Sequence, residues 1–360
     1  MRSSGPIKVL IVDDSPLIRS MLSRVLSAES DIEVVGGAKN PFEARELIIN
    51  YRPDVIILDI EMPRMDGLTF LNKLMQHYPV PVIMCSGVAP SSSHNALKAI
   101  ELGAVDVVCK PNTGGNQALR RLGEDLAEKV RAAAISMPPP PPIPVCAKNT
   151  PTSFRAAGLD PSRYVVAIGA STGGTEAIKK TLERVPPDFP PVVIVQHMPE
   201  GFTKSFAERL NQFSALTVTE AAHGDTLEVG KAFLARGGLQ MRIEGTPGRF
   251  RIAYGNDEPV NRHCPSVCVL FDSVARLVGK RAIGILLTGM GADGAKGLLN
   301  MRQNGAITIA QDQRSCVVYG MPKVAFEIGA VQRQCAPTEV SKAVLQTLKA
   351  RDGVRATAHV

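Results

Sequence analysis

Short hydrophobic runs alternate with helical patterns along the first third of the chain. Each run has the length of a strand, and most are followed by a segment whose apolar residues recur at helical spacing. The runs cover residues 8–14, 33–38, 54–60, 81–87 and 106–111. Strands that alternate with helices form a parallel sheet covered on both faces. The pattern predicts an α/β domain with a five-stranded parallel sheet.

The same alternation resumes in the second half. Several short strands between residues 216 and 254 interrupt it. Strands are predicted at 163–170, 190–198, 281–289 and 306–312, and helices at 172–184, 203–213, 266–279 and 294–305. The second half is therefore predicted to be a doubly wound α/β domain with a small β insertion.

A proline-rich stretch separates the two patterns. It contains five consecutive prolines, Pro138 to Pro142. Proline lacks a backbone donor and favours an extended conformation, so this stretch is predicted to be a semi-rigid linker. The expected organisation is a first domain over 1–130, a linker over 131–162, a second domain over 163–352 and a tail over 353–360.

Composition narrows the class of protein. The net charge is +7, but the basic residues are scattered, aromatic residues are 4% and Trp is absent, which argues against nucleic acid as a partner. The longest apolar runs are strand-sized, well short of the roughly 20 residues of a membrane span, so we expect no membrane insertion. The seven cysteines lack metal-type spacing and fit a reducing compartment, which indicates a cytoplasmic protein.

Polar residues follow several predicted strands of the first domain. The carboxyl ends of parallel strands meet at one edge of a sheet, where chemistry gathers. Clustered carboxylates suit Mg²⁺, and a lysine with a small hydroxyl can hold phosphoryl oxygens. The residues expected at this edge are Asp13, Asp14, Asp59, Ser86 and Lys110.

The motifs VDDSP, LDIEMPRMDG, CSG and CKP of this half resemble those of a two-component receiver domain, which has a flavodoxin-like fold. The resemblance implies that Asp59 accepts a phosphoryl group from a histidine kinase. It further implies that the Asp13 and Asp14 pair, Asp59 and the Glu61 carbonyl hold Mg²⁺, and that Ser86 and Lys110 sense the phosphoryl group. Val107 departs from the aromatic residue that receivers often carry, so an aromatic switch is not expected there.

The segment GASTGG, residues 169–174, permits two interpretations. A glycine-rich turn between strand and helix can bind a dinucleotide, but that site needs an acidic residue after the next strand. Gln196 and His197 stand there instead. The alternative is a G-x-S-x-G turn that exposes Ser171 as a nucleophile.

A serine nucleophile needs a base and a residue that orients the base. His197 ends a predicted strand on the same edge as Ser171, whereas His223 and His263 lie in irregular segments and remain reserve candidates. Asp293 lies in a glycine-rich loop beyond another strand and is the expected orienter. The Thr172 amide, at the start of the following helix, is a candidate oxyanion donor.

Four segments of the second half resemble motifs of the chemotaxis-type protein-glutamate methylesterases, the CheB family. They are AIGASTGGTEAI, QHMPEGFTKSFAERLN, LLTGMGADGAKGL and QDQRSCVVYGMP. The resemblance implies hydrolysis of glutamate methyl esters on chemoreceptors, often with deamidation of receptor glutamines, without a cofactor at the esterase step. It implies Ser171, His197 and Asp293 as the catalytic residues and the Met290 amide as a second oxyanion donor.

Four residues depart from the family pattern around the predicted site: Arg236, Gln240, Cys264 and Cys268. If they contact a partner, the choice of partner has changed. Two alternatives therefore stay open at this point. One is the same hydrolase chemistry on receptors of a non-chemotaxis signalling array, and the other is a response regulator whose output domain only binds a partner.

Overall fold

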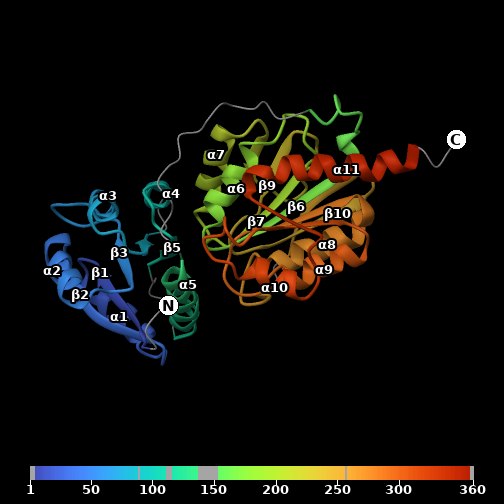
Figure 1. Ribbon diagram of the computed structural model, residues 1–360. Coiled ribbons are helices and arrows are strands. Elements are labelled where there is room, and N and C mark those ends of the chain that lie inside the picture. The colour runs from blue at the N-terminus through green and yellow to red at the C-terminus, as the bar shows by residue number, and fades with distance from the viewer. Residues whose placement is uncertain (1–4, 88–89, 111–115, 137–152, 256–257, 357–360) are drawn as a thin grey trace. The chain divides into compact units, whose positions relative to one another are not determined.

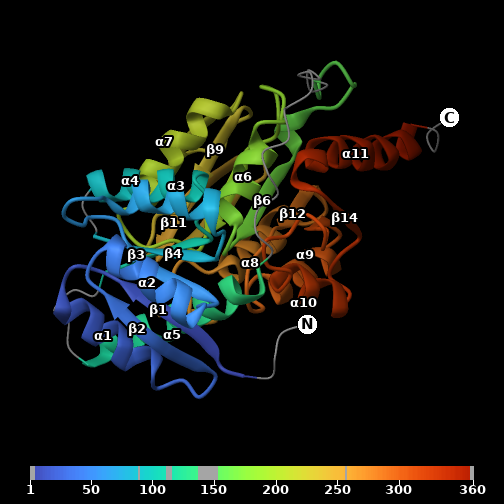
Figure 2. The same cartoon turned by 60° about the vertical axis from the view of Figure 1, so that its left-hand side comes forward.

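The computed structural model describes residues 5–87, 90–110, 116–136, 153–255 and 258–356 (Figures 1 and 2). The chain divides into two compact units, Met1–Pro142 and Ile143–Val360. Within the described residues, no helix is both long and apolar enough to cross a membrane.

The first unit is built on a parallel sheet with the order β2-β1-β3-β4-β5. Its helices cover both faces, with α1 and α5 on one and α2, α3 and α4 on the other (Figure 2). The strands are β1 (Ile7–Val12), β2 (Ile32–Ala38), β3 (Val55–Asp59), β4 (Val82–Ser86) and β5 (Asp106–Cys109). The helices are α1 (Pro16–Leu26), α2 (Pro41–Tyr51), α3 (Gly67–His77), α4 (Pro90–Glu101) and α5 (Asn116–Ile135). The prediction of a five-stranded parallel α/β domain is confirmed.

Local signals explain where these elements begin. β3 and β4 are buried along their whole length, as strands covered on both faces are, which is why they read as continuous apolar runs. Ser15, Asn40 and Asp66 cap α1, α2 and α3 by accepting hydrogen bonds from backbone amides of the first turn. Because the strands are parallel, their carboxyl ends and the starts of the helices that follow them lie along one edge of the sheet.

The second unit is built on a larger parallel sheet with the order β14-β13-β12-β6-β7-β9-β8. Its strands are β6 (Val165–Ala170), β7 (Val192–Gln196), β8 (Thr217–Glu220), β9 (Lys231–Leu234), β12 (Ala282–Leu286), β13 (Ile307–Gln311) and β14 (Arg333–Cys335). The helices are α6 (Gly174–Leu182), α7 (Thr203–Phe213), α8 (Val267–Val278), α9 (Ala295–Gln303), α10 (Met321–Glu327) and α11 (Val340–Ala356). In Figure 1, α6, α7 and α11 cover one face of this sheet and α8, α9 and α10 the other. The doubly wound architecture is confirmed.

The insertion is smaller than the sequence predicted. β8 and β9 pair in parallel with the main sheet, so only β10 (Gln240–Thr246) and β11 (Arg249–Gly255) form a separate antiparallel hairpin. Apolar side chains of the hairpin, including Ile243 and Ile252, join the core beneath α8. The hairpin therefore packs against α8 and extends the core of the second unit.

Packing redefines the ends of the linker predicted at residues 131–162. Helix α5 continues to Ile135, and Ala132 and Ala133 are buried in the first unit. Phe154 is fully buried in the second unit, with its ring centroid 5.1 Å from that of Phe189. Both ends of the predicted linker are therefore held by folded units. Its middle, residues 137–152 with the five prolines, lies outside the described residues.

Candidate active site and phosphorylation site

Ser171 lies in the tight turn between β6 and α6. Its backbone amide donates to the Thr288 carbonyl at 3.0 Å, which ties the turn to the segment after β12. A Cβ on Gly289 would lie 2.7 Å from the Ser171 Cβ, so only glycine permits this approach. Ser171 is thus held at the carboxyl edge of the sheet.

The next strand brings His197 beside this turn. Ala170 and Gln196 are register partners in β6 and β7, and the His197 amide donates to the Ala170 carbonyl at 3.0 Å. The buried Gln196 carboxamide donates to the carbonyls of Ser171, at 2.9 Å, and His197, at 3.1 Å. Gln196, which replaces the acid of a dinucleotide site, therefore fixes the backbones of both residues.

His197 contacts Asp293 directly. Its Nε2 lies 2.9 Å from Asp293 Oδ2, and the two side chains are 7% and 1% exposed. The ionised carboxylate can only accept, so the Nε2 proton faces it. The buried His197 Nδ1 has no hydrogen-bond partner among the described residues, and no described bond joins it to Ser171 Oγ. Nδ1 is then the nitrogen with a free lone pair.

Asp293 is enclosed by donors at the N-terminus of α8. Its carboxylate accepts from the amides of Val267, at 2.6 Å, and Cys268, at 3.3 Å. The Ser266 hydroxyl, at 2.8 Å, and the Asn261 carboxamide, at 2.7 Å, complete the set. Burial opposes ionisation, but the hydrogen bonds outweigh it and hold the Asp293 pKa well below its ordinary value. Asp293 therefore stays a carboxylate.

The two reserve histidines have different surroundings, and only His263 contacts His197 among the described contacts. The His263 ring stacks on that of His197, with centroids 3.6 Å apart and planes at 14°. His223 instead accepts from the Tyr254 amide of β11 through Nδ1. No spacing in the sequence indicated the contact of His263 with the candidate base, nor those of Asn261 and Ser266 with Asp293.

The two candidate oxyanion donors flank Ser171. Thr172 follows it in the turn, and the Thr172 carbonyl accepts from the Thr288 hydroxyl at 3.1 Å. Met290 follows the glycine that packs on Ser171, and across the described ranges its amide donates no hydrogen bond. The Thr288 hydroxyl thus holds the Thr172 backbone, and the Met290 amide has no described acceptor.

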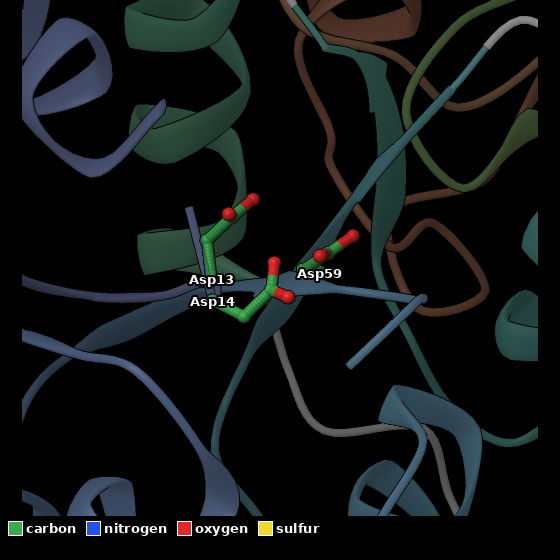
Figure 3. A group of neighbouring side chains, drawn as sticks. All are labelled: Asp13, Asp14 and Asp59. Atoms are coloured by element: carbon green, nitrogen blue, oxygen red, sulfur yellow. The ribbon is translucent and has the colours of Figure 1, made fainter. Parts of the chain in front are cut away.

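In the first unit, three carboxylates gather at the ends of β1 and β3 (Figure 3). Asp13, Asp14 and Asp59 each offer an oxygen, and these oxygens lie within 4.8 Å of one another. The Lys110 ammonium lies 3.1 Å from Asp13 Oδ2 and 2.7 Å from Asp59 Oδ2. The buried Ser86, at the end of β4, donates to the Gly87 carbonyl. The expected residues therefore meet at one edge.

Burial dominates the electrostatics of Asp59. Desolvation and the neighbouring Asp13 raise the pKa of Asp59 to about 6, although Lys110 acts in the opposite direction. Beyond their ion pairs with Lys110, the buried Oδ2 atoms of Asp13 and Asp59 have no hydrogen-bond partner in the described part of the chain. Oxygen ligands of this charge and with free lone pairs fit a hard divalent cation.

Two features shape the loop after Asp59. The Glu61 amide donates to Asp59 Oδ1 at 3.2 Å, and the Glu61 side chain is exposed. A Cβ on Gly67 would lie 2.0 Å from the Asp59 carbonyl oxygen, so glycine is required where α3 begins. The motif glycine therefore serves close packing against the acidic edge.

The two units, one with an acidic edge and one with a serine–histidine–aspartate cluster, define a response regulator with a hydrolase-type output unit. The profile of the response regulator receiver domain matches residues 9–120, and that of CheB methylesterase matches residues 166–344. The chain belongs to the CheB methylesterase family.

Similarity to relatives extends over nearly the whole chain. Protein-glutamate methylesterase/protein-glutamine glutaminase 1 of Dechloromonas aromatica (strain RCB) is 47% identical, over 96% of this chain and all of the relative. The protein-glutamate methylesterase/protein-glutamine glutaminase of Salmonella typhimurium is 46% identical, over 97% and 99%. The crystal structure of the Thermotoga maritima CheB methylesterase catalytic domain superposes with a TM-score of 0.50 at 34% identity, covering 51% of this chain and 98% of that domain.

Proposed function

We propose that this chain is a phosphorylation-regulated hydrolase that removes methyl esters from glutamate residues of chemoreceptors and deamidates receptor glutamines. The names of relatives that match it from end to end support this activity. One observation carries the chemistry, namely the His197–Asp293 hydrogen bond beside the Ser171 turn. A binding-only output unit would need no such arrangement.

The reaction we propose is acyl transfer through Ser171. His197 Nδ1 takes the proton of Ser171 Oγ, which attacks the ester carbonyl carbon. The C–O bond to the methoxy group breaks, His197 returns the proton to this oxygen, and methanol leaves. A water molecule, deprotonated by His197, then attacks the acyl-enzyme. His197 gives that proton to Ser171 Oγ as the acyl–oxygen bond breaks, and the product acid loses its own proton to become the glutamate carboxylate. With a glutamine substrate the leaving group is ammonia.

Asp293 and two backbone amides complete the proposed machinery. Asp293 holds the Nε2 proton, which leaves Nδ1 basic, and it stabilises the imidazolium that forms in each step. The Thr172 and Met290 amides are assigned to the oxyanion, and the N-terminus of α6 favours the same negative charge. Every group in this scheme belongs to the second unit.

The proposed input is phosphorylation of the first unit. Asp59 attacks the phosphoryl group of a histidine kinase, and Lys110 and Ser86 contact the phosphoryl oxygens. Asp13, Asp14, Asp59 and the Glu61 carbonyl would hold Mg²⁺, which, when bound, neutralises charge on the phosphoryl oxygens. The family match and the clustered carboxylates support this assignment.

The proposed partners are methylated chemoreceptors and a histidine kinase, which implies a cytoplasmic location. The cysteines of the described residues support a reducing compartment, since six of them form no disulfide. The basic surface of the chain, with a net charge of +7, suits acidic receptor segments.

Methanol release from receptor-containing membranes bearing isotopically labelled methyl esters tests the proposal. The Ser171→Ala protein should release no methanol above background. Ser162→Ala is a matched control, because Ser162 is an exposed hydroxyl that precedes β6 and so lies at the opposite edge of the sheet. Full activity of the Ser171→Ala protein would refute the serine mechanism, and no release by the unaltered protein would refute the substrate.

A further inference from the structure

The loop between β11 and α8 carries three residues that contact the candidate triad. Asn261 and Ser266 donate to Asp293 Oδ1, at 2.7 and 2.8 Å. The His263 ring covers one face of the His197 ring, with centroids 3.6 Å apart. The conformation of this loop therefore determines how the orienting carboxylate and the candidate base are held.

The centre of the loop is a tight turn in an unfavourable conformation. Val260 and His263 exchange backbone hydrogen bonds of 3.0 and 2.9 Å, which closes a two-residue turn. The two residues between them, Asn261 and Arg262, have φ values of 52° and 72°. This left-handed region favours glycine, and a β-carbon at Arg262 makes the turn costly. A turn of this kind persists only where its surroundings hold it.

Gln240 supplies that support. It is the first residue of β10, and its side chain is completely buried. Its Nε2 donates to the His263 carbonyl at 3.0 Å and to the Glu258 carbonyl at 3.4 Å. Its Oε1 accepts from the Ser266 amide at 2.8 Å. One carboxamide thus binds the loop on both sides of His263.

We propose that Gln240 is a positioning residue for the hydrolytic reaction, acting through the 258–266 loop on Asp293 and His197. It touches neither substrate nor reacting atoms. Its donor fixes the backbone of His263, and its acceptor fixes the backbone of Ser266 just before α8. The inference rests on the proposed roles of Ser171, His197 and Asp293.

The test uses a fluorophosphonate, which labels an activated serine, on the full chain. Gln240→Met keeps the length of the side chain but removes its donor and acceptor. Labelling of Ser171 should become slower by about ten- to a hundred-fold, since small misplacements of catalytic groups have effects of this size. On an Asp293→Ala background the same substitution should slow labelling by a smaller factor, because its effect through Asp293 is already lost and only its effect through His263 on His197 remains.

Ser273→Ala is the matched control. Ser273 is also buried, and its hydroxyl accepts a hydrogen bond from the Ile243 amide of β10. Removing this hydroxyl weakens the packing of β10 on α8 but leaves the contacts of the 258–266 loop in place. This protein should be destabilised like Gln240→Met but labelled at the normal rate. If Gln240→Met does not fold, Gln240→Glu applies the same criterion, because it keeps the volume and the acceptor while losing the donor to His263.

Two outcomes would overturn the proposal. One is labelling of Gln240→Met within about two-fold of normal, and the other is an equal loss with and without Asp293. Labelling of Ser171 does not depend on the natural substrate. A protein that is labelled normally but releases no methanol from receptor membranes would contradict the proposed substrate and leave the test of Gln240 intact.

Discussion

Asp293 receives hydrogen bonds from five residues that lie 25 to 96 positions away from it in the sequence. Two are backbone amides of α8, two are side chains of the preceding loop, and one is the imidazole of His197. A neutral carboxamide could not accept all of these bonds and would turn an N–H group toward at least one donor. The charge and the orientation of Asp293 are therefore both set by its surroundings.

The Asp293→Asn protein should lose activity through the tautomer of His197. The new amide would present a donor to Nε2, so that Nε2 must accept and Nδ1 carries the proton. We expect the rate of methanol release to fall on the order of 10³- to 10⁴-fold, the size seen when an orienting carboxylate is neutralised. Asp272→Asn, at an exposed carboxylate of α8 that accepts a hydrogen bond from Asn300 of α9, should remain active.

The low pKa of Asp293 also predicts how stability depends on pH. A carboxyl whose pKa is lower in the folded than in the unfolded state stabilises the fold above its unfolded value, here near 3.8, and this contribution disappears as the pH falls through the folded value. The melting temperature of the unaltered protein should therefore exceed that of Asp293→Asn at about pH 7, and the gap should narrow at about pH 3. A gap that widens in acid would contradict this assignment.

Sequence reasoning reached the residues that follow strands. It named His263 only as a reserve candidate, without its place beside His197, and it did not find Asn261 or Ser266. Ser171, His197 and Asp293 follow recognisable strands and share one edge, so topology alone brings them near each other. His263, Asn261 and Ser266 reach the site through a turn with two left-handed residues. No side-chain periodicity encodes that turn, and its path depends on the buried Gln240.

At the scale of elements, the turn after β12 must approach the turn after β6 very closely. Gly289 lies between Ser171 and Met321, and its own carbonyl accepts from the amides of Gly320 and Met321. The approach thus joins β12, β6 and the start of α10 at one point. A methyl group there has no room.

Gly289→Ala should therefore disturb the active edge. The added Cβ would lie 2.3 Å from Met321 Sδ and 2.7 Å from Ser171 Cβ, so both contacts must be relieved by a shift of these residues or of the turn. We expect a loss of about 1–3 kcal/mol in the free energy of unfolding, together with slower fluorophosphonate labelling of Ser171. Gly36→Ala on β2, where the nearest atom is 3.4 Å away at the tip of Leu47, is the control. If both substitutions lowered the stability and the labelling rate equally, the close packing of Gly289 on Ser171 would have no special role.

The elements themselves were predicted unevenly. Strands buried on both faces, such as β6 and β7, read directly as apolar runs. β14 was missed because it is three residues long and two of its side chains are exposed, so it has no apolar run. α11 buries Val340, Val344 and Leu348 at helical spacing, a signal that could have identified it. β8 and β9 were assigned to the insertion because short strands do not reveal which sheet they join.

At the scale of the whole molecule, the chain joins a proposed phosphorylation site and a proposed hydrolytic site that share no residues. Asp59 and its neighbours belong to the first unit, and Ser171, His197 and Asp293 belong to the second. The residues that carry each chemistry can therefore be changed separately. Control of one site by the other is the central claim of the proposed function.

The most direct test is the initial rate of methanol release by the full chain, with and without a small acyl phosphate as phosphodonor and Mg²⁺. We predict that the phosphodonor raises the rate of the unaltered protein, and that Asp59→Asn keeps a basal rate that the phosphodonor does not change. Ser171→Ala should release no methanol under either condition. An equal rise in the Asp59→Asn protein, or no rise in an unaltered protein that is demonstrably phosphorylated on Asp59, would contradict the account.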